Sequence, residues 1–351
     1  MRKAIRQSAT MVGLAVAAAC ANPSGPEANQ AQFNTKRVRD GVATVERVNS
    51  SPILQSFRWL GGQVPSVAVA PSGDTDRLVG LVRDIAAMVS PAGGPAAVPV
   101  IRSSMLGKTM VYDPVAKRYL VAEGRVGAPT NGVRFVLYEN DAEGRPNVAK
   151  EIGYSDLTDE KAASATTAGL RLKVVSAEKT YLDYSFDLTG SIGAATVTVK
   201  GFMSDGTERV NFDLATTGQL FGRGGTVTLD AKLEVPSQQF SVVVKAVGLA
   251  GENQGPGQVE LTVRAGSDVV AINAKMTPAA VDAAVTVNGK LFATIKGDPA
   301  SPVIRGEGGR ELSADELAAL GAVFEFSEGI FELIAGLLAP AGALLLLGLG
   351  I

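Results

Sequence analysis

Apolar and polar residues alternate with a period of two along the chain from about residue 100 to 297. Val227 and Leu229, for example, alternate with Thr228 and Asp230. The same pattern recurs over residues 196–201, 209–214, 226–235, 259–264, 270–276 and 285–288. Successive side chains of a strand point to opposite faces, so each segment predicts an antiparallel strand with one buried and one solvated face.

Turn-forming residues separate these segments at short intervals. They are Asp113-Pro114, Asp205-Gly206, Pro236-Ser237, Gly266-Ser267-Asp268 and Asn288-Gly289. Such turns join neighbouring antiparallel strands, and the chain has room for a meander of about 12 to 14 strands. A sheet that wide curls strongly. We therefore expect a mainly β (α+β) fold whose large antiparallel meander sheet forms a curved half-barrel or an incompletely closed barrel.

Two segments outside this region have helical spacing. Residues 74–90 carry apolar side chains three and four positions apart, with Asp74 as a candidate N-cap, and predict a short N-terminal helix. Ser313 and Glu316 match a capping box, in which each side chain bonds the backbone N–H of the other residue. The apolar face that follows predicts a long helix over 313–338. We expect this long helix to pack on the sheet.

The C-terminal tail allows two interpretations. Residues 333–351 form a run of 19 without a charged side chain, which is near the length that spans a bilayer. Pro340 interrupts this run, and no Lys or Arg follows it in the sequence. The tail therefore either plugs the apolar face of the sheet or is embedded in a membrane.

The start of the chain has the order of a bacterial export signal. Arg2, Lys3 and Arg6 precede an apolar stretch at 9–19 that is too short to span a bilayer, and Cys20 follows it. A cysteine directly after small residues resembles the lipobox of bacterial lipoproteins. The resemblance implies cleavage before Cys20 and acylation of its thiol, as with palmitate, so that the lipid attaches the protein to a membrane.

The resemblance covers residues 1–20 and departs from the family pattern at Ala17, where leucine is usual. Ordinary cleavage after Ala19 or Ala21, giving a secreted protein, is the alternative. In the family, a residue such as Ala21 after the cysteine implies sorting to the outer membrane. The predicted organisation is a signal peptide (1–19), a lipid-anchor cysteine with a flexible tether (20–50), a β-meander domain (51–310), and a C-terminal amphipathic helix with an apolar tail (311–351).

Composition removes several classes of function. The chain has no histidine and one cysteine, which excludes histidine-dependent triads, histidine zinc sites and disulfides within the chain. Removal of the signal lowers the basic side chains from 33 to 30 against 35 acids, a formal net charge of −5. No basic patch stands out, so nucleic acid is not an expected partner. Aromatic residues are 5% of the chain, which disfavours an aromatic stacking platform.

Two short motifs imitate catalytic sequences. Gly107-Lys108-Thr109 matches the end of a phosphate-binding loop, but Arg102 stands where the first glycine is required, and a strand follows. Ser176-Ala177-Glu178-Lys179 has the Ser-x-x-Lys spacing of serine acyl-enzymes, but the partner motifs Ser-Asp-Asn and Lys-Thr-Gly are missing from the sequence. We expect a hairpin turn at 176–179, no catalytic residue and no enzyme activity.

Acidic residues give two candidate metal sites. Glu139–Gly144 resembles the start of a calcium loop, but Lys150 stands where the bidentate acid is required, which favours a polar hairpin tip. Asp156, Asp159 and Glu160 predict a small acidic loop. We expect neither segment to hold a metal or a cofactor.

Asp183 and Asp187 are a candidate pair of catalytic carboxylates on one strand face. Residues four apart on a strand lie about 13 Å from each other, which is too far for a glycosidase pair, so we expect a solvated face. The single tryptophan, Trp59, is expected to belong with Phe57 and Leu60 to the core or to anchor the linker.

These features predict a non-catalytic envelope lipoprotein that binds a hydrophobic small molecule or an envelope protein through an apolar sheet face. A curved sheet with an apolar lining and a helical plug resembles, in architecture alone, the lipoprotein- and lipid-carrier half-barrels of bacterial envelopes. One alternative is a structural or surface scaffold whose sheet is plugged by its own tail. The other is an outer-membrane β-barrel, which the lack of aromatic girdles in the sequence disfavours.

Overall fold

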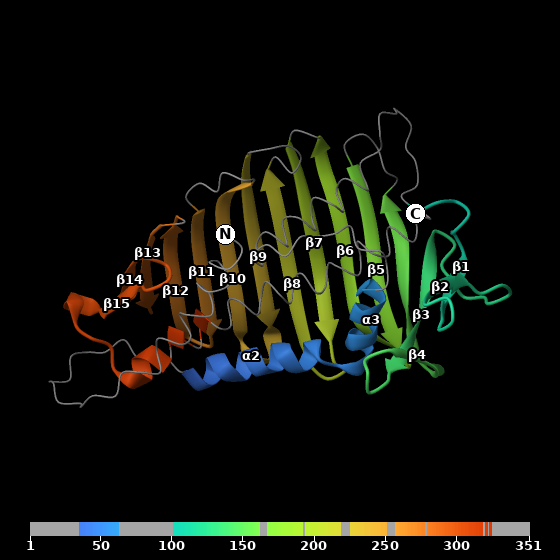
Figure 1. Cartoon of the computed structure of the whole chain (residues 1–351), viewed down its shortest axis with the longest axis horizontal. Coiled ribbons are helices and arrows are strands. Elements are labelled where there is room, and N and C mark those ends of the chain that lie inside the picture. The colour runs from blue at the N-terminus through green and yellow to red at the C-terminus, as the bar shows by residue number, and fades with distance from the viewer. Residues whose placement is uncertain are drawn as a thin grey trace.

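A single open sheet of fifteen strands dominates the structure (Figure 1). This computed structural model describes residues 35–62, 101–161, 167–191, 194–218, 225–250, 257–277, 279–318, 320–321 and 323–324. β2 and β15 form the two edges of the sheet and do not pair with each other, so the sheet is not closed into a barrel. The predicted mainly β meander is therefore confirmed.

The strands follow one another in the sheet almost in chain order, β15 to β3 and then β1 and β2. Neighbours are antiparallel except β1 and β3, which are parallel. Their bounds are β1 (Lys108–Asp113), β2 (Arg118–Val121), β3 (Gly132–Asn140), β4 (Pro146–Lys161), β5 (Thr167–Ser176), β6 (Lys179–Ser191), β7 (Ala194–Ser204), β8 (Arg209–Gly218), β9 (Gly225–Val235), β10 (Phe240–Ala250), β11 (Gly257–Ala265), β12 (Asp268–Met276), β13 (Val281–Val287), β14 (Lys290–Gly297) and β15 (Val303–Gly306).

The strand count exceeds the expected 12 to 14, because the sequence pattern does not mark β15. β15 has four residues and lies beyond residue 297, where the alternating pattern ends. β2, at the other edge, also has four residues and follows the predicted turn at Asp113-Pro114. Short edges also leave few unpaired backbone groups for another chain to bind.

The alternation in the sequence corresponds directly to the two faces of the sheet. In β8, Val210, Phe212 and Leu214 are buried, whereas Asn211 and Asp213 between them are partly exposed. Burying each large apolar side chain of this kind contributes about 1.5–3 kcal/mol. One face of the sheet is consequently an apolar layer and the other a polar outer face.

The predicted hairpin turns are confirmed, and backbone geometry explains two of them. At 176–179, Ala177 (φ 45°) and Glu178 (φ 64°) are both left-handed, as a two-residue hairpin turn requires. Asn288 (φ 52°) and Gly289 (φ 79°) form the corresponding turn between β13 and β14. Asparagine and glycine tolerate this conformation best.

Part of the predicted tether is wrong, since residues of the 20–50 segment form a helix. α2 (Thr35–Asn49) lies across the ends of β7 to β11, and α3 (Pro52–Gly62) contacts β3 to β6 (Figure 1). Val38, Val45 and Val48 fall on one face of α2 at spacings of seven and three and are buried. Burial against the sheet stabilises a helix that composition alone did not suggest.

The core role expected for the residues around Trp59 is confirmed. Phe57 and Leu60 on α3 are fully buried. The Trp59 ring packs edge-on against the ring of Tyr112 on β1, with 4.9 Å between centroids. α3 is therefore an integral part of the fold.

The C-terminal helix is described only at its start. Residues 314–318, 320–321 and 323–324 are helical. The capping box is confirmed: Ser313 N–H donates to the Glu316 carboxylate at 2.8 Å, and Glu316 N–H donates to Ser313 Oγ at 3.2 Å. The predicted helix at 74–90, the rest of the predicted 313–338 helix and Cys20 lie outside the described residues.

Candidate functional site

The apolar layer is the first candidate surface. One row of residues crosses eleven consecutive strands, β3 to β13, with one residue directly opposite the next. Its members are Val133, Leu157, Leu172, Tyr184, Gly201, Phe212, Leu233, Val242, Val263, Val270 and Val287. Apart from Gly201, none of these side chains is more than 3% exposed. We call this set the central apolar row.

Gly201 allows two aromatic rings of the central apolar row to meet. The rings of Tyr184 and Phe212, on either side of it, lie 5.9 Å apart at 62°. A Cβ on Gly201 would lie 2.1 Å from the carbonyl oxygen of Asp183 and 2.4 Å from the Cβ of Tyr184. Glycine is thus required here by close approach.

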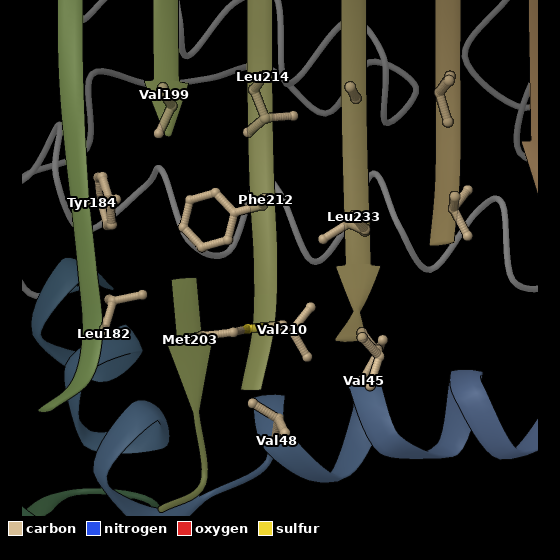
Figure 2. Packing of buried hydrophobic residues seen from close by; sticks show 14 of the residues in the cluster. Val45, Val48, Leu182, Tyr184, Val199, Met203, Val210, Phe212, Leu214 and Leu233 are labelled. Atoms are coloured by element: carbon tan, nitrogen blue, oxygen red, sulfur yellow. The ribbon is translucent and has the colours of Figure 1, made fainter. Parts of the chain in front are cut away.

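Helices α2 and α3 cover one end of the apolar layer. Figure 2 shows Val45 and Val48 of α2 beside the ends of the strands that carry Val210 and Leu233. All four side chains belong to one buried cluster. Helix α2 therefore covers the apolar layer at the end where a turn joins β7 to β8.

Polar contacts fix α2 to the hairpin turns at this end. The Gln238 amide donates to Thr44 Oγ1 at 2.6 Å, and the Arg47 guanidinium lies 3.5 Å from the Asp205 carboxylate. Gly41 approaches the ring of Phe240 so closely that a Cβ would lie 2.4 Å from it. These contacts hold α2 to the turns that follow β7 and β9.

Charged side chains on the polar outer face obey a simple rule of sign. In the described registers, charged residues lie directly opposite one another in ten pairs, and every pair joins an acid to a base. The pairs are Asp113–Arg118, Arg134–Asp156, Asp156–Lys173, Lys173–Asp183, Lys200–Asp213, Asp213–Lys232, Asp230–Lys245, Lys245–Glu260, Lys275–Asp282 and Asp282–Lys296. Opposite charges across strands stabilise a register, and like charges destabilise it. The alternation thus favours the observed pairing, because the sign of the charge changes from each strand to the next within five linked sets of residues.

Two bidentate ion pairs lie on this face across β3 to β6. Arg134 forms a bidentate pair with Asp156 at 2.7 and 2.8 Å, and its guanidinium carbon lies 3.5 Å from the centroid of the Tyr154 ring. Hydrogen bonding to Asp156 raises the pKa of Arg134. Arg171 binds Asp183 in the same bidentate way at 2.7 and 2.9 Å, and this bond raises the pKa of Arg171.

A shallow depression of about 270 Å³ opens on this part of the outer face. Its lining is entirely polar: Asn131, Asp156, Thr158, Glu160, Arg171 and Lys173. Asp156 and Arg171 are already occupied by the ion pairs that each makes with a neighbouring strand. The depression offers no apolar wall and no buried charge, which small-molecule sites usually have.

The predicted acidic loop at Asp156, Asp159 and Glu160 is wrong, because all three lie in β4. The three closely spaced acids suggested a loop, but Asp156 and Glu160 lie on the polar face of a strand. Arg134 and Arg171 offset their charge there. Asp183 and Asp187 both lie on β6, as expected. Arg171 binds the Asp183 carboxylate, which therefore takes part in an ion pair between strands.

The short motifs that the sequence did not favour as sites form structural contacts. Ser176 Oγ donates to the carbonyl oxygen of Ile152 at 2.5 Å, within a hairpin. Lys108 and Thr109 begin β1, so no helix follows the phosphate-loop motif. Glu139 pairs with Lys150 at 3.1 Å across the polar hairpin tip. No group of three or more metal-binding side chains occurs among the residues that the structure describes.

Comparison of the chain with family models, with curated proteins and with solved structures found no match in any of the three. In the part of the chain with described structure, no helix has the length and apolar character needed to cross a membrane. Candidate function must therefore be argued from the two faces of the sheet. Sequence periodicity identified the apolar face, whereas the charge rule of the outer face required the strand register.

Proposed function

We propose that the protein is a non-catalytic envelope lipoprotein that binds a hydrophobic ligand against the apolar layer of its sheet. In this proposal acylated Cys20 anchors it in a bacterial envelope, at the outer membrane. The support at the N-terminus is the sequence pattern before Cys20. The support in the fold is the contrast between the two faces of the sheet.

The observation that carries the proposal is the central apolar row. It continues for eleven strands, and the Tyr184 hydroxyl is the one polar side-chain group among its members. Neighbouring strands lie about 4.8 Å apart, so the row extends for about 50 Å. Helices α2 and α3 lie at one end of the strands (Figure 1). An apolar surface of this length, with few groups able to hydrogen-bond, suits an acyl chain better than a polar substrate.

The outer face supports a non-catalytic role. Seven carboxylates lie directly opposite a base in a neighbouring strand, as Asp156 lies opposite Arg134. Acid–base catalysis needs a titrating group free to exchange a proton with substrate. A face with alternating charges also lacks the continuous positive potential that attracts nucleic acid to a protein.

A scaffold function is the second candidate, and a specific observation favours it. The apolar layer is almost completely shielded from solvent in the structure, with Leu229 and Val199 no more than 4% exposed. Leu320 and Val323, at the start of the C-terminal helix, belong to the same core. A sheet plugged by its own chain would serve as a rigid structural or surface module.

A pair of tryptophan reporters separates the two functions. In a Trp59→Phe background, Phe212→Trp places the indole in the apolar layer, and Asn211→Trp places it on the outer face of the same strand. A brominated fatty acid quenches a nearby indole. We expect saturable quenching of the Phe212→Trp protein and none of the Asn211→Trp protein. Absence of quenching in both would exclude the ligand-binding function and favour the scaffold.

Truncation after Gly309 tests the plug itself. Removal of residues 310–351 takes away Leu320 and Val323 and is expected to expose apolar surface that binds a hydrophobic dye. The full chain serves as the control. A truncated protein that stays soluble and binds no more dye than the full chain would contradict a C-terminal plug.

A further inference from the structure

We propose that α2 is a hinged lid on the apolar layer, which swings about its C-terminal end to admit the hydrophobic ligand. This inference rests on the proposed ligand-binding function and adds the route by which the ligand enters. It follows from how differently the sheet holds the two helices.

α3 is held by large side chains inside the core. Leu54, Phe57 and Leu60 are each no more than 1% exposed. The backbone N–H of Tyr138 on β3 donates to Ser56 Oγ at 3.2 Å, which ties the middle of the helix to the sheet. Moving α3 would open cavities among the largest buried side chains.

α2 is held by smaller side chains and by contacts at the turns. Its buried apolar residues are three valines, which remove less area from water than leucine or phenylalanine. Its polar contacts include a side-chain hydrogen bond from Gln238 and an ion pair between Arg47 and Asp205 at 3.5 Å. Asp205 is largely shielded, but the Arg47 side chain is 56% exposed, and water competes for an ion pair whose cation is exposed.

The joint between the helices places the pivot at the C-terminal end of α2. Only Ser50 and Ser51 separate the helices. The Arg58 side chain on α3 donates to the carbonyl oxygen of Asn49, and the Gln55 amide donates to that of Ser50 at 2.9 Å. These bonds retain the last turn of α2 on α3, while the contacts at Thr44 and Gly41 lie further along the lid.

The position of α2 fits an entrance. It crosses the ends of β7 to β11 beside the turns, and Val38 and Val45, which lie outside its last turn, belong to the same buried cluster as Val210. Swinging α2 away would uncover this end of the apolar layer without breaking any strand pairing. In the chain, α2 is also the first described element after Cys20, and fourteen residues (21–34) separate the two. A lipid anchor would thus keep the lid near the membrane that supplies the ligand.

A reversible cross-link tests the lid. Cysteines at the contacting positions, Thr44→Cys and Gln238→Cys, are joined by a short bifunctional methanethiosulfonate in a Cys20→Ser protein carrying the Trp59→Phe and Phe212→Trp reporter. Stopped-flow mixing with a brominated fatty acid then measures the rate of quenching. We expect the cross-link to slow quenching at least ten-fold and a reductant to restore the original rate.

The matched control cross-links two strands and leaves α2 untouched. Thr196→Cys and Thr217→Cys join β7 to β8 on the outer face, where the two native hydroxyl oxygens lie 3.1 Å apart. This cross-link should leave the quenching rate unchanged. Equal rates with and without the α2 cross-link would overturn the lid while the ligand-binding function stands. Absence of quenching before any cross-linking would overturn that function, and the lid with it.

Hydrogen exchange gives a readout that needs no ligand. Opening of α2 alone predicts that amides of residues 35–49 exchange at least ten-fold faster than those of residues 52–62. Equal protection of the two helices would show that they open together and would contradict a lid formed by α2.

Discussion

The Arg134–Asp156 pair allows the role of the outer-face charges to be tested in energetic terms. Both side chains are largely shielded, at 20% and 15% exposed, and two hydrogen bonds of 2.7 and 2.8 Å join them. Asp156→Asn keeps the shape of the side chain but removes its charge. The guanidinium of Arg134 then loses its counter-charge while it remains over the Tyr154 ring.

The expected loss of stability in Asp156→Asn follows from the charged partners of Asp156, which are Arg134 and Lys173. Hydrogen bonds between charged groups contribute about 1.5–3 kcal/mol each in buried settings, and partial exposure lets water replace part of this. Asp156 also faces Lys173 on β5, which adds about 0.2–1 kcal/mol across the strands. We therefore expect Asp156→Asn to lower the free energy of unfolding by about 2 kcal/mol.

A double-mutant cycle in urea measures the coupling. Arg134→Met retains the apolar stem over Tyr154 and removes the charge. The double variant Arg134→Met/Asp156→Asn should cost about 1.5 kcal/mol less than the sum of the two single variants, with an unchanged slope in urea. Asp230→Asn, at an exposed position of β9, is the control and should change stability by less than about 0.5 kcal/mol. Additive single effects would refute the pairing argument.

Three further predictions concern other parts of the chain. Gly201→Ala should destabilise by about 1–3 kcal/mol in thermal unfolding, because the new methyl group overlaps the strand of Tyr184; an unchanged melting temperature would contradict the close approach. Arg310 lowers the pKa of Glu316 below its ordinary 4.5, so the stability from this bond is present above that value and lost as pH falls through the lowered pKa. Acid unfolding of Glu316→Gln should lack this component, and a curve parallel to that of the wild type would count against it. Cys20→Ser should abolish incorporation of labelled palmitate and release the protein from membranes; retained label would disprove anchoring at Cys20.

The strands were predictable because their signal is local. Alternation in β8 and β9 reports a buried and a solvated face without reference to any other part of the chain. Turn chemistry at Asn288-Gly289 is equally local. The expected meander therefore followed from short-range patterns, and the short strand β15 escaped because four residues carry too little of them.

The helix α2 could not be predicted in the same way. Only three valines mark its buried face, and four basic residues surround them in a segment that follows an Asn- and Pro-rich stretch. Its helical state depends on the sheet that Val38, Val45 and Val48 contact. The acids of β4 were misread for a related reason. These acids pair with bases in other strands, and the register that brings each acid opposite a base exists only in the folded sheet.

Native mass spectrometry of the full-length protein, extracted from membranes in a mild detergent, tests the central claim most directly. The account predicts a protein whose mass includes acyl groups on Cys20 and which retains, in addition, a non-covalent lipid that dissociates on activation. The Phe212→Asp substitution, which places a charged side chain in the central apolar row, should remove that lipid. Circular dichroism checks that the variant is folded. A wild-type protein that is consistently free of non-covalent lipid would contradict ligand binding by the apolar layer.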